Sequence, residues 1–186
     1  MLADAPKGAE SRIVVAAREA LEATTKEVIS AKDKLAEKER DLAKDYGADD
    51  VFRALQGKCV STESGEYMYE LCWLDRTTQK QKRGGGSGTN MGNFNRIDWA
   101  DADEEDRPDG KGLGSGRRMV LRYEGGTSCW NGPQRRTDVW LACSETEELW
   151  RISEAEKCVY RMEVGTPAAC DVVEVAEASG VEKDEL

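Results

Sequence analysis

The apolar positions between Ser11 and about Asp45 follow a helical period, in a stretch without glycine or proline. This heptad spacing predicts a long amphipathic helix, with Ser11 as its N-cap and Gly47 where it stops. Thr24 and Lys38 are polar and interrupt the apolar seam of this helix, so two interpretations stay open. One is a coiled coil with a partner chain, and the other is a helix that packs on its own domain or forms a surface stalk. The seam consists of Val14, Ala17, Leu21, Thr24, Val28, Ala31, Leu35, Lys38 and Leu42.

From residue 58 onward the pattern changes to a period of two, which indicates β-strands. After a turn signal at residues 64–65, Tyr67, Tyr69, Leu71 and Trp73 form one face of such a segment. Short alternating segments separated by turn signals predict a mainly β domain. Further strand candidates lie at residues 117–124, 137–143, 149–152 and 158–164.

Residues 83–117 have a different composition, with clustered glycines and an acidic run at residues 101–106. We expect a long solvated loop that holds one short strand or ribbon near residues 91–99. The glycines do not follow a strand and open a helix, so they do not predict a phosphate-binding loop. The acidic run lacks the ligand spacing of a calcium-binding EF-hand.

The chain is acidic, with 37 Asp and Glu against 27 Lys and Arg and a net charge of -10. No basic stretch is present, so we expect neither a nucleic-acid nor an anionic-membrane partner. No apolar run is long enough to predict a membrane-spanning helix. The sequence has no histidine, which excludes Ser-His-Asp and Cys-His catalysis and the usual zinc sites. We expect no metal and no cofactor.

The chain ends in Lys183, Asp184, Glu185 and Leu186, which form an endoplasmic-reticulum retention signal and predict residence in that lumen. The N-terminus lacks the apolar core of a signal peptide, so we expect a fragment of a longer protein. In an oxidising compartment six cysteines indicate disulfides. The absence of Cys-x-x-Cys argues against zinc, and spacing alone leaves fifteen pairings open.

Five short motifs, given below in their order along the chain, together resemble a mannose 6-phosphate receptor homology (MRH) domain. The resemblance is greatest to the domain in glucosidase II β subunits. The resemblance covers about residues 59–170. Three further features also fit that subunit: the charged helix, the segment at residues 45–47 that leads into the domain, and the retention signal. The motifs are Tyr-x-Tyr-x-x-Cys at 67–72, Thr-Gln-Lys at 78–80, Cys-Trp-Asn-Gly-Pro at 129–133, Cys-x-Tyr at 158–160 and Thr-Pro-Ala-Ala-Cys at 166–170.

The resemblance implies a flattened β-barrel of two packed antiparallel sheets with a mannose pocket on one face. It implies three disulfides: Cys59–Cys72, Cys129–Cys158 and Cys143–Cys170. The family binds sugar through a Gln, an Arg, a Glu and a Tyr, with a Trp added in this subunit's version. The matching positions here are Gln79, Arg135, Glu154, Tyr160 and Trp130, and two neighbours, Arg136 and Glu156, compete for the Arg and Glu roles.

These residue types suit a neutral sugar. A carboxylate only accepts hydrogen bonds, a guanidinium donates in a fixed fork and an amide does both, so together they can distinguish adjacent hydroxyls. Without the motifs, Arg135 and Glu154 are ordinary surface charges, Gln79 is a loop residue and Trp130 is a core aromatic. A glycosidase is a further alternative, but nothing in the sequence fixes a pair of carboxylates at catalytic separation.

We therefore divide the chain into a lead at 1–10, a helical segment at 11–57, an MRH domain at 58–170 and an acidic tail at 171–186. The predicted function is a non-catalytic lectin subunit of glucosidase II. It would bind mannose of high-mannose N-glycans and promote glucose trimming by the α subunit, which it would contact through parts expected to be missing here. The alternatives are a luminal lectin that sorts misfolded glycoproteins for degradation and a coiled-coil adaptor.

Overall fold

The computed structural model describes residues 11–83 and 86–170. They fall into two units, which meet in the sequence between Lys44 and Asp45. The first unit is the helix α1 (Arg12–Leu42), and its N-cap Ser11 accepts a hydrogen bond from the Ile13 N–H at 3.4 Å. Among the described residues, no helix combines the length and apolarity that crossing a membrane requires.

The predicted end of the helix was wrong by several residues, because α1 stops at Leu42 and not near Gly47. The physical reason lies just downstream. Tyr46 is almost completely buried in the core of the second unit, and Phe52 is too. The chain must leave helical geometry before Tyr46 to place this side chain among the strands.

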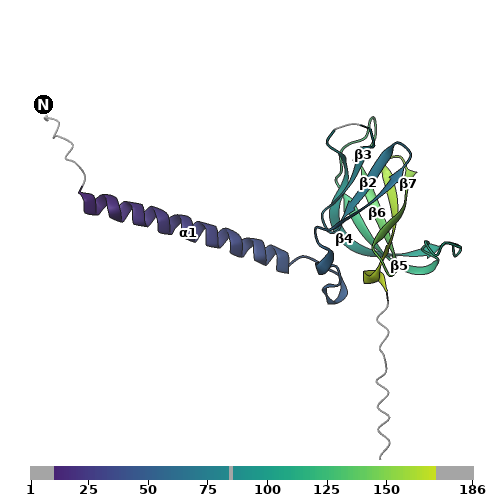
Figure 1. Ribbon diagram of the computed structural model, residues 1–186, viewed down its shortest axis with the longest axis horizontal. Coiled ribbons are helices and arrows are strands. Elements are labelled where there is room, and N and C mark those ends of the chain that lie inside the picture. Colours follow the sequence, from purple (N-terminus) through teal and green to yellow (C-terminus); the bar gives the residue numbers. More distant parts are fainter. Residues whose placement is uncertain (1–10, 84–85, 171–186) are drawn as a thin grey trace, which may run out of the picture. The chain divides into compact units, whose positions relative to one another are not determined.

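The second unit is an eight-stranded, nearly closed, barrel-like sheet (Figure 1). The order of the strands across the sheet is β1-β2-β3-β4-β5-β6-β8-β7, and its two edge strands, β1 and β7, lie against each other. The mainly β, barrel-like prediction is confirmed. The strands are β1 (Cys59–Ser64), β2 (Tyr67–Cys72), β3 (Arg76–Gln81), β4 (Thr89–Asp103), β5 (Ser115–Glu124), β6 (Arg136–Cys143), β7 (Glu148–Glu156) and β8 (Val159–Thr166), and the 3-10 helices are η1 (Ala48–Asp50), η2 (Arg53–Leu55) and η3 (Pro167–Ala169).

The sheet is not purely antiparallel, because β8 lies between β6 and β7 and runs parallel to β6. Both strands therefore start at one end of the barrel and finish at the other. Cys129 and Cys158 precede the two strands and are bonded to each other, while Cys143 and Cys170 lie at their far ends and form a second bridge. With Cys59–Cys72 across the β1–β2 hairpin, these are the pairings that the resemblance implies.

The prediction of a long loop over residues 83–117 was wrong in its extent, although the strand expected near residues 91–99 lies within β4. β4 is the longest strand, with 15 residues, and it pairs with β5 from Asn93↔Glu124 to Asp103↔Ser115. The connection between the two strands is only residues 104–114. Glycine and acidic composition concealed an alternating strand whose inward side chains include the fully buried Met91.

The acidic residues of this ribbon face arginines on neighbouring strands. Asp98 accepts a hydrogen bond from the Arg122 Nε at 3.2 Å, and Arg122 also bridges Asp138 on β6 at 2.8 Å. Glu104 pairs with Arg161 of β8 at 2.5 Å. Within the acidic run at residues 101–106, Glu104 therefore makes a cross-strand ion pair, whereas Asp101, Asp103, Glu105 and Asp106 are exposed.

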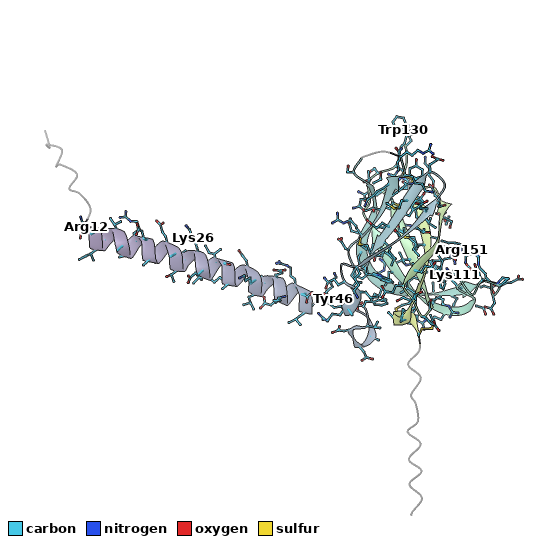
Figure 2. All side chains as sticks on the ribbon, in the orientation of Figure 1. Arg12, Lys26, Tyr46, Lys111, Trp130 and Arg151 are labelled. Atoms are coloured by element: carbon cyan, nitrogen blue, oxygen red, sulfur yellow. A yellow bond between two sulfur atoms is a disulfide. The ribbon has the colours of Figure 1, made fainter. Side chains whose placement is uncertain are left out.

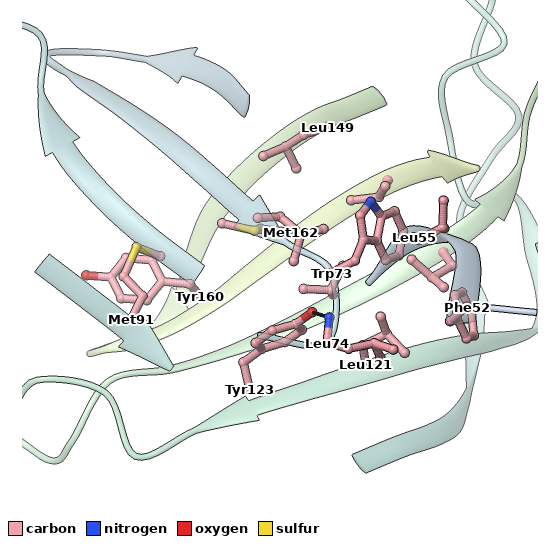
Figure 3. Close-up of a cluster of buried hydrophobic side chains, with 14 of the residues drawn as sticks. Phe52, Leu55, Trp73, Leu74, Met91, Leu121, Tyr123, Leu149, Tyr160 and Met162 are labelled. Carbon is pink, nitrogen blue, oxygen red and sulfur yellow. Dashed lines mark hydrogen bonds between the residues drawn. The ribbon is translucent and has the colours of Figure 1, made fainter. Parts of the chain in front are cut away.

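The core includes two aromatic side chains from outside the strands, Phe52 and Trp73 (Figure 3). The Phe52 ring stacks on Trp73 with centroids 5.9 Å apart. Tyr123 of β5 is fully buried, and its hydroxyl accepts from the Leu74 N–H at 3.2 Å and donates to the Cys72 carbonyl at 3.3 Å. This one phenol ties the β2–β3 turn to the middle of the sheet.

A second buried polar contact crosses the barrel interior. The Thr77 hydroxyl on β3 donates to the Thr137 hydroxyl on β6 at 3.0 Å, and Thr137 donates to the Met91 carbonyl on β4 at 3.1 Å. Both threonines are completely buried. The chain of bonds therefore fixes the spacing of three strands from the inside.

Replacing Thr137 with Val should lower the free energy of unfolding by roughly 1–3 kcal/mol, because it leaves the Thr77 hydroxyl and the Met91 carbonyl buried without their partner. Urea titration followed by circular dichroism measures the change. The exposed Thr146 is the matched control, and Thr146→Val should leave the midpoint almost unchanged. Equal midpoints for the two variants would contradict the structural role of the contact.

Candidate carbohydrate-binding site

Gln79 lies on β3 directly opposite Tyr69 of β2. Its Nε2 donates a hydrogen bond to the Tyr69 hydroxyl at 3.0 Å. This bond holds the amide in one orientation, and it leaves the Gln79 Oε1 as an acceptor and the second N–H as a donor. Gln79 is half-buried, so these groups face a partly enclosed space.

Tyr69 lies beside three of the predicted residues, Gln79, Glu154 and Tyr160. Burial raises the pKa of its phenol above the ordinary value, the hydrogen bond from Gln79 opposes this, and the nearby Tyr160, Tyr67 and Glu154 raise the pKa further. The phenol is therefore a neutral O–H at neutral pH. Because it already accepts from Gln79, its own proton is available for a ligand acceptor.

Arg135 immediately precedes β6, and its guanidinium is fixed by the loop before it. Nη1 donates to the carbonyls of Thr127 and Ser128, both at 3.1 Å. Nε is buried without a hydrogen-bond partner in the described part of the chain. The competing Arg136 is exposed, so the structure distinguishes the two arginines by burial and by fixation.

Glu154 and Tyr160 lie opposite each other on β7 and β8. Glu154 Oε1 accepts from the Cys158 N–H at 2.7 Å, which closes the turn between these strands. The other carboxylate oxygen receives no hydrogen bond from the described residues. Tyr160 is buried, with 6% of its surface exposed. Glu154 and the competing Glu156 are both exposed, so the bond to Cys158, and not burial, distinguishes Glu154.

The sequence left open that Trp130 is a core aromatic. This alternative is wrong, because 88% of the Trp130 surface is exposed. It projects from the tip of the β unit (Figure 2). The turn that carries it is closed by the Gly132 N–H donating to the Cys129 carbonyl at 3.3 Å. Lys157 donates to the Asn131 carbonyl at 2.8 Å, so the Trp130 turn is held against the β7–β8 turn by this bond and by the Cys129–Cys158 disulfide.

A cavity of about 350 Å³ opens beside these groups. Gln79 and Arg135 line it directly, whereas Glu154, Tyr160 and Trp130 do not belong to its lining. Glu154 and Tyr160 lie near Tyr69, the partner of Gln79, and Trp130 lies on the exposed turn. The lining residues are Tyr67, Gln79, Lys80, Gln81, Gly86, Ser87, Thr89 and Arg135.

Sequence reasoning did not assign a site role to Tyr69 or Tyr67. The alternation placed both on one face of a strand, and their rings lie with centroids 6.2 Å apart. The missing information was the β2–β3 register, which sets Tyr69 opposite Gln79. Counting outward from the short turn between the two strands could have supplied that register.

A family model described as "Glucosidase II beta subunit-like protein" matches residues 17–185 of this chain. The chain belongs to this family. Glucosidase 2 subunit beta of Mycosarcoma maydis is 36% identical over 167 residues, which cover 88% of this chain and 26% of the relative. The human protein of the same name is 33% identical over 131 residues, which cover 70% of this chain and 22% of the relative. The chain thus spans about a quarter of the length of these family members.

Solved structures of MRH domains are also similar. The MRH domain of Yos9, complexed with alpha3,alpha6-Man5, has 17% sequence identity and a TM-score of 0.51, and it covers 64% of this chain and 81% of its own. This likeness shows the MRH fold. The MRH domain of glucosidase II beta bound to mannose is 31% identical with a TM-score of 0.45, over 64% of this chain and 99% of its own.

The predicted retention signal, Lys183 to Leu186, lies outside the described residues. It remains a prediction from the sequence, as do the assigned roles of the five site residues.

Tyr69 supplies a pH test of the site's geometry. Its folded-state pKa is raised, so its contribution to stability is complete below the ordinary tyrosine pKa of about 10 and is lost as the pH rises through the folded value. Spectrophotometric titration of the folded protein should show late-titrating phenols, one fewer in Tyr69→Phe. An unchanged late phase in Tyr69→Phe would contradict the burial of this hydroxyl.

Proposed function

We propose that the β unit is a lectin module that binds a terminal mannose through Gln79, Arg135, Glu154 and Tyr160, with Trp130 as an apolar contact. The observation that supports this most is the convergence of Gln79 and Arg135 on one cavity, with Glu154 and Tyr160 gathered around the adjoining Tyr69. A cavity of about 350 Å³ is large enough for a monosaccharide.

The polar groups complement a sugar without competing with one another. The Arg135 guanidinium has already used Nη1 on the backbone and its Nε is buried, so Nη2 is the nitrogen that would donate to a ligand. Glu154 supplies an acceptor, since its carboxylate has one oxygen outside the bond to Cys158. The Gln79 amide can both donate and accept a hydrogen bond, and the Tyr69 hydroxyl can donate one. Fixed donors and acceptors of this kind can satisfy neighbouring hydroxyls together.

Selectivity should arise where mannose and glucose differ, at a single hydroxyl. An epimer that points this hydroxyl elsewhere leaves a buried donor or acceptor of the site unpaired, and that penalty is the basis of discrimination. The Arg135 guanidinium and the Gln79 amide are held by the protein before a ligand arrives. Little side-chain ordering is then needed on binding.

For the whole protein, the proposal is a non-catalytic β subunit of an α-glucosidase complex in the endoplasmic-reticulum lumen. Its module would capture high-mannose N-glycans and present their glucosylated arm to the catalytic α subunit. Family membership supports the β-subunit role, and the Lys-Asp-Glu-Leu ending supports the compartment.

A luminal lectin that sorts misfolded glycoproteins is the second candidate, because an OS-9 homolog of Emericella nidulans is 27% identical over 168 residues that cover 73% of this chain. Co-purification separates the two. The full-length protein carrying this segment should retain a glucosidase α subunit in a pull-down with lumen extract. Recovery of degradation machinery without the α subunit would favour the sorting role.

Glu154→Gln should abolish binding of the oxidised protein to a high-mannose glycan array, because the amide replaces an acceptor by a donor toward the ligand. Glu156→Gln removes the same charge two residues away, also on the exposed surface, and should bind as the parent does. Thermal unfolding of both variants checks that they fold. If the parent binds no glycan on the array, the lectin proposal is wrong; if Glu156→Gln alone loses binding, the assignment of the carboxylate is wrong.

Removing the Cys129–Cys158 bridge by paired Ser substitutions should weaken glycan binding more than it disturbs the core. The bridge closes a segment with a sequence separation of 29, so its loss should lower the free energy of unfolding by about 3–4 kcal/mol on the loop-entropy model. It also removes the covalent link between the Trp130 turn and the β7–β8 turn and leaves the Lys157–Asn131 hydrogen bond to hold them together. The control is the Cys59–Cys72 pair at the β1–β2 hairpin, whose removal should cost stability but preserve binding at temperatures where the variant is folded. Binding equal to the parent in the folded variant without Cys129–Cys158 would refute the positioning role.

A further inference from the structure

The helix α1 exposes its entire apolar seam. None of its residues is buried, and Leu21, Leu35 and Leu42 have 67%, 59% and 75% of their surface exposed. An isolated helix gains most of its stability from packing an apolar face. A seam along a helix of 31 residues, none of them buried in the described chain, therefore indicates a second surface that covers it.

The two positions of the heptad carry side chains of different size. Every a position is a large aliphatic residue, whereas every d position is small or has a flexible stem. The a positions are Val14, Leu21, Val28, Leu35 and Leu42, and the d positions are Ala17, Thr24, Ala31 and Lys38. A partner must therefore offer small side chains where this helix is large, and large ones where it is small.

A second copy of the same helix meets this requirement when it runs antiparallel. With Val28 opposite Ala31 of the other copy, Leu35 lies opposite Thr24. The same register sets Leu21 against the aliphatic stem of Lys38, whose ammonium can extend to water. A parallel, in-register pair packs less well, because each residue of the seam then meets the same residue of the other copy. Large side chains would face large ones, small side chains would face small ones, and Lys38 would face Lys38.

The charges that flank the seam also fit this arrangement. Glu27 and Lys34 occupy g positions, and g positions face each other across an antiparallel pair. In the register above, each Glu27 lies beside Lys34 of the other copy, and Arg18 lies beside Glu39 along the e positions. In the described part of the chain no ion pair is formed by Glu27 or Lys34.

We propose that α1 mediates self-association of this chain as an antiparallel two-stranded coiled coil. This proposal goes beyond the lectin role, because it identifies the partner of the helix as a second copy of the same chain. Each dimer would then carry two binding modules. A branched glycan presents several sugar ends, so two modules in one particle would gain avidity where both can reach the same ligand.

Charge exchange tests both the association and its direction. By analytical ultracentrifugation, the full chain should be a concentration-dependent dimer. Lys34→Glu should weaken this dimer several-fold, because the introduced carboxylate then faces Glu27 of the other copy. The double variant Glu27→Lys with Lys34→Glu should restore the dimer, since the two charges simply exchange places across the pair. In a parallel pair the same double variant would set the introduced lysine against Lys32 and the introduced carboxylate against Glu39, so dimerisation would fall further.

Lys26→Glu makes the same charge change on the outer face of the helix and should leave the dimer intact; circular dichroism checks helix content in every variant. Disulfide trapping gives an independent readout. Leu21→Cys and Lys38→Cys should cross-link when the two proteins are mixed, and neither should cross-link with itself. A monomer at high micromolar concentration, or efficient self-cross-linking of Leu21→Cys, would overturn the proposal.

Discussion

The hydrogen bond between the Thr77 and Thr137 hydroxyls is the contact on which the geometry of the site depends. Thr77 stands two residues before Gln79, and Thr137 stands two residues after Arg135 and pairs with Tyr160 in the sheet. The two halves of the candidate site are therefore joined by one buried bond of 3.0 Å. Because a strand repeats every two residues, Gln79 lies on the same face of β3 as Thr77, and Arg135 directly precedes the strand that carries Thr137.

The parallel pairing of β6 with β8 explains a disulfide pattern that looks complicated in the sequence. Parallel strands start at one end of the barrel and finish at the other, so bridges that join start to start and end to end must interleave along the chain. The start bridge, Cys129–Cys158, lies beside the carriers of Trp130, Glu154 and Tyr160, and the end bridge lies away from them. The parallel pairing of β6 with β8 therefore both closes this part of the sheet and positions the candidate site.

The sequence predicted the strands with clear alternation and the helix with its heptads, since both signals are local. Within residues 83–117 it predicted only a short strand near residues 91–99, because the glycine, asparagine and aspartate residues interspersed between the buried Met91 and Ala102 look like a loop. The acidic side chains there pair with arginines of β5 and β8, and this pairing is non-local, so no window of sequence contains it. For the same reason Tyr69 was missed: its place opposite Gln79 depends on the register between two strands.

The Cys143–Cys170 bridge also determines how the barrel responds to mechanical load. Cys170 is the last described residue, and its sulfur is bonded to the end of β6, a strand in the interior of the sheet. A force applied to the chain beyond residue 170 is thus transmitted through a covalent bond into β6 and does not unzip β8 one hydrogen bond at a time. A pull on the chain beyond Cys170 would act on the barrel as a whole, and the strands that carry the candidate site would keep their register under tension.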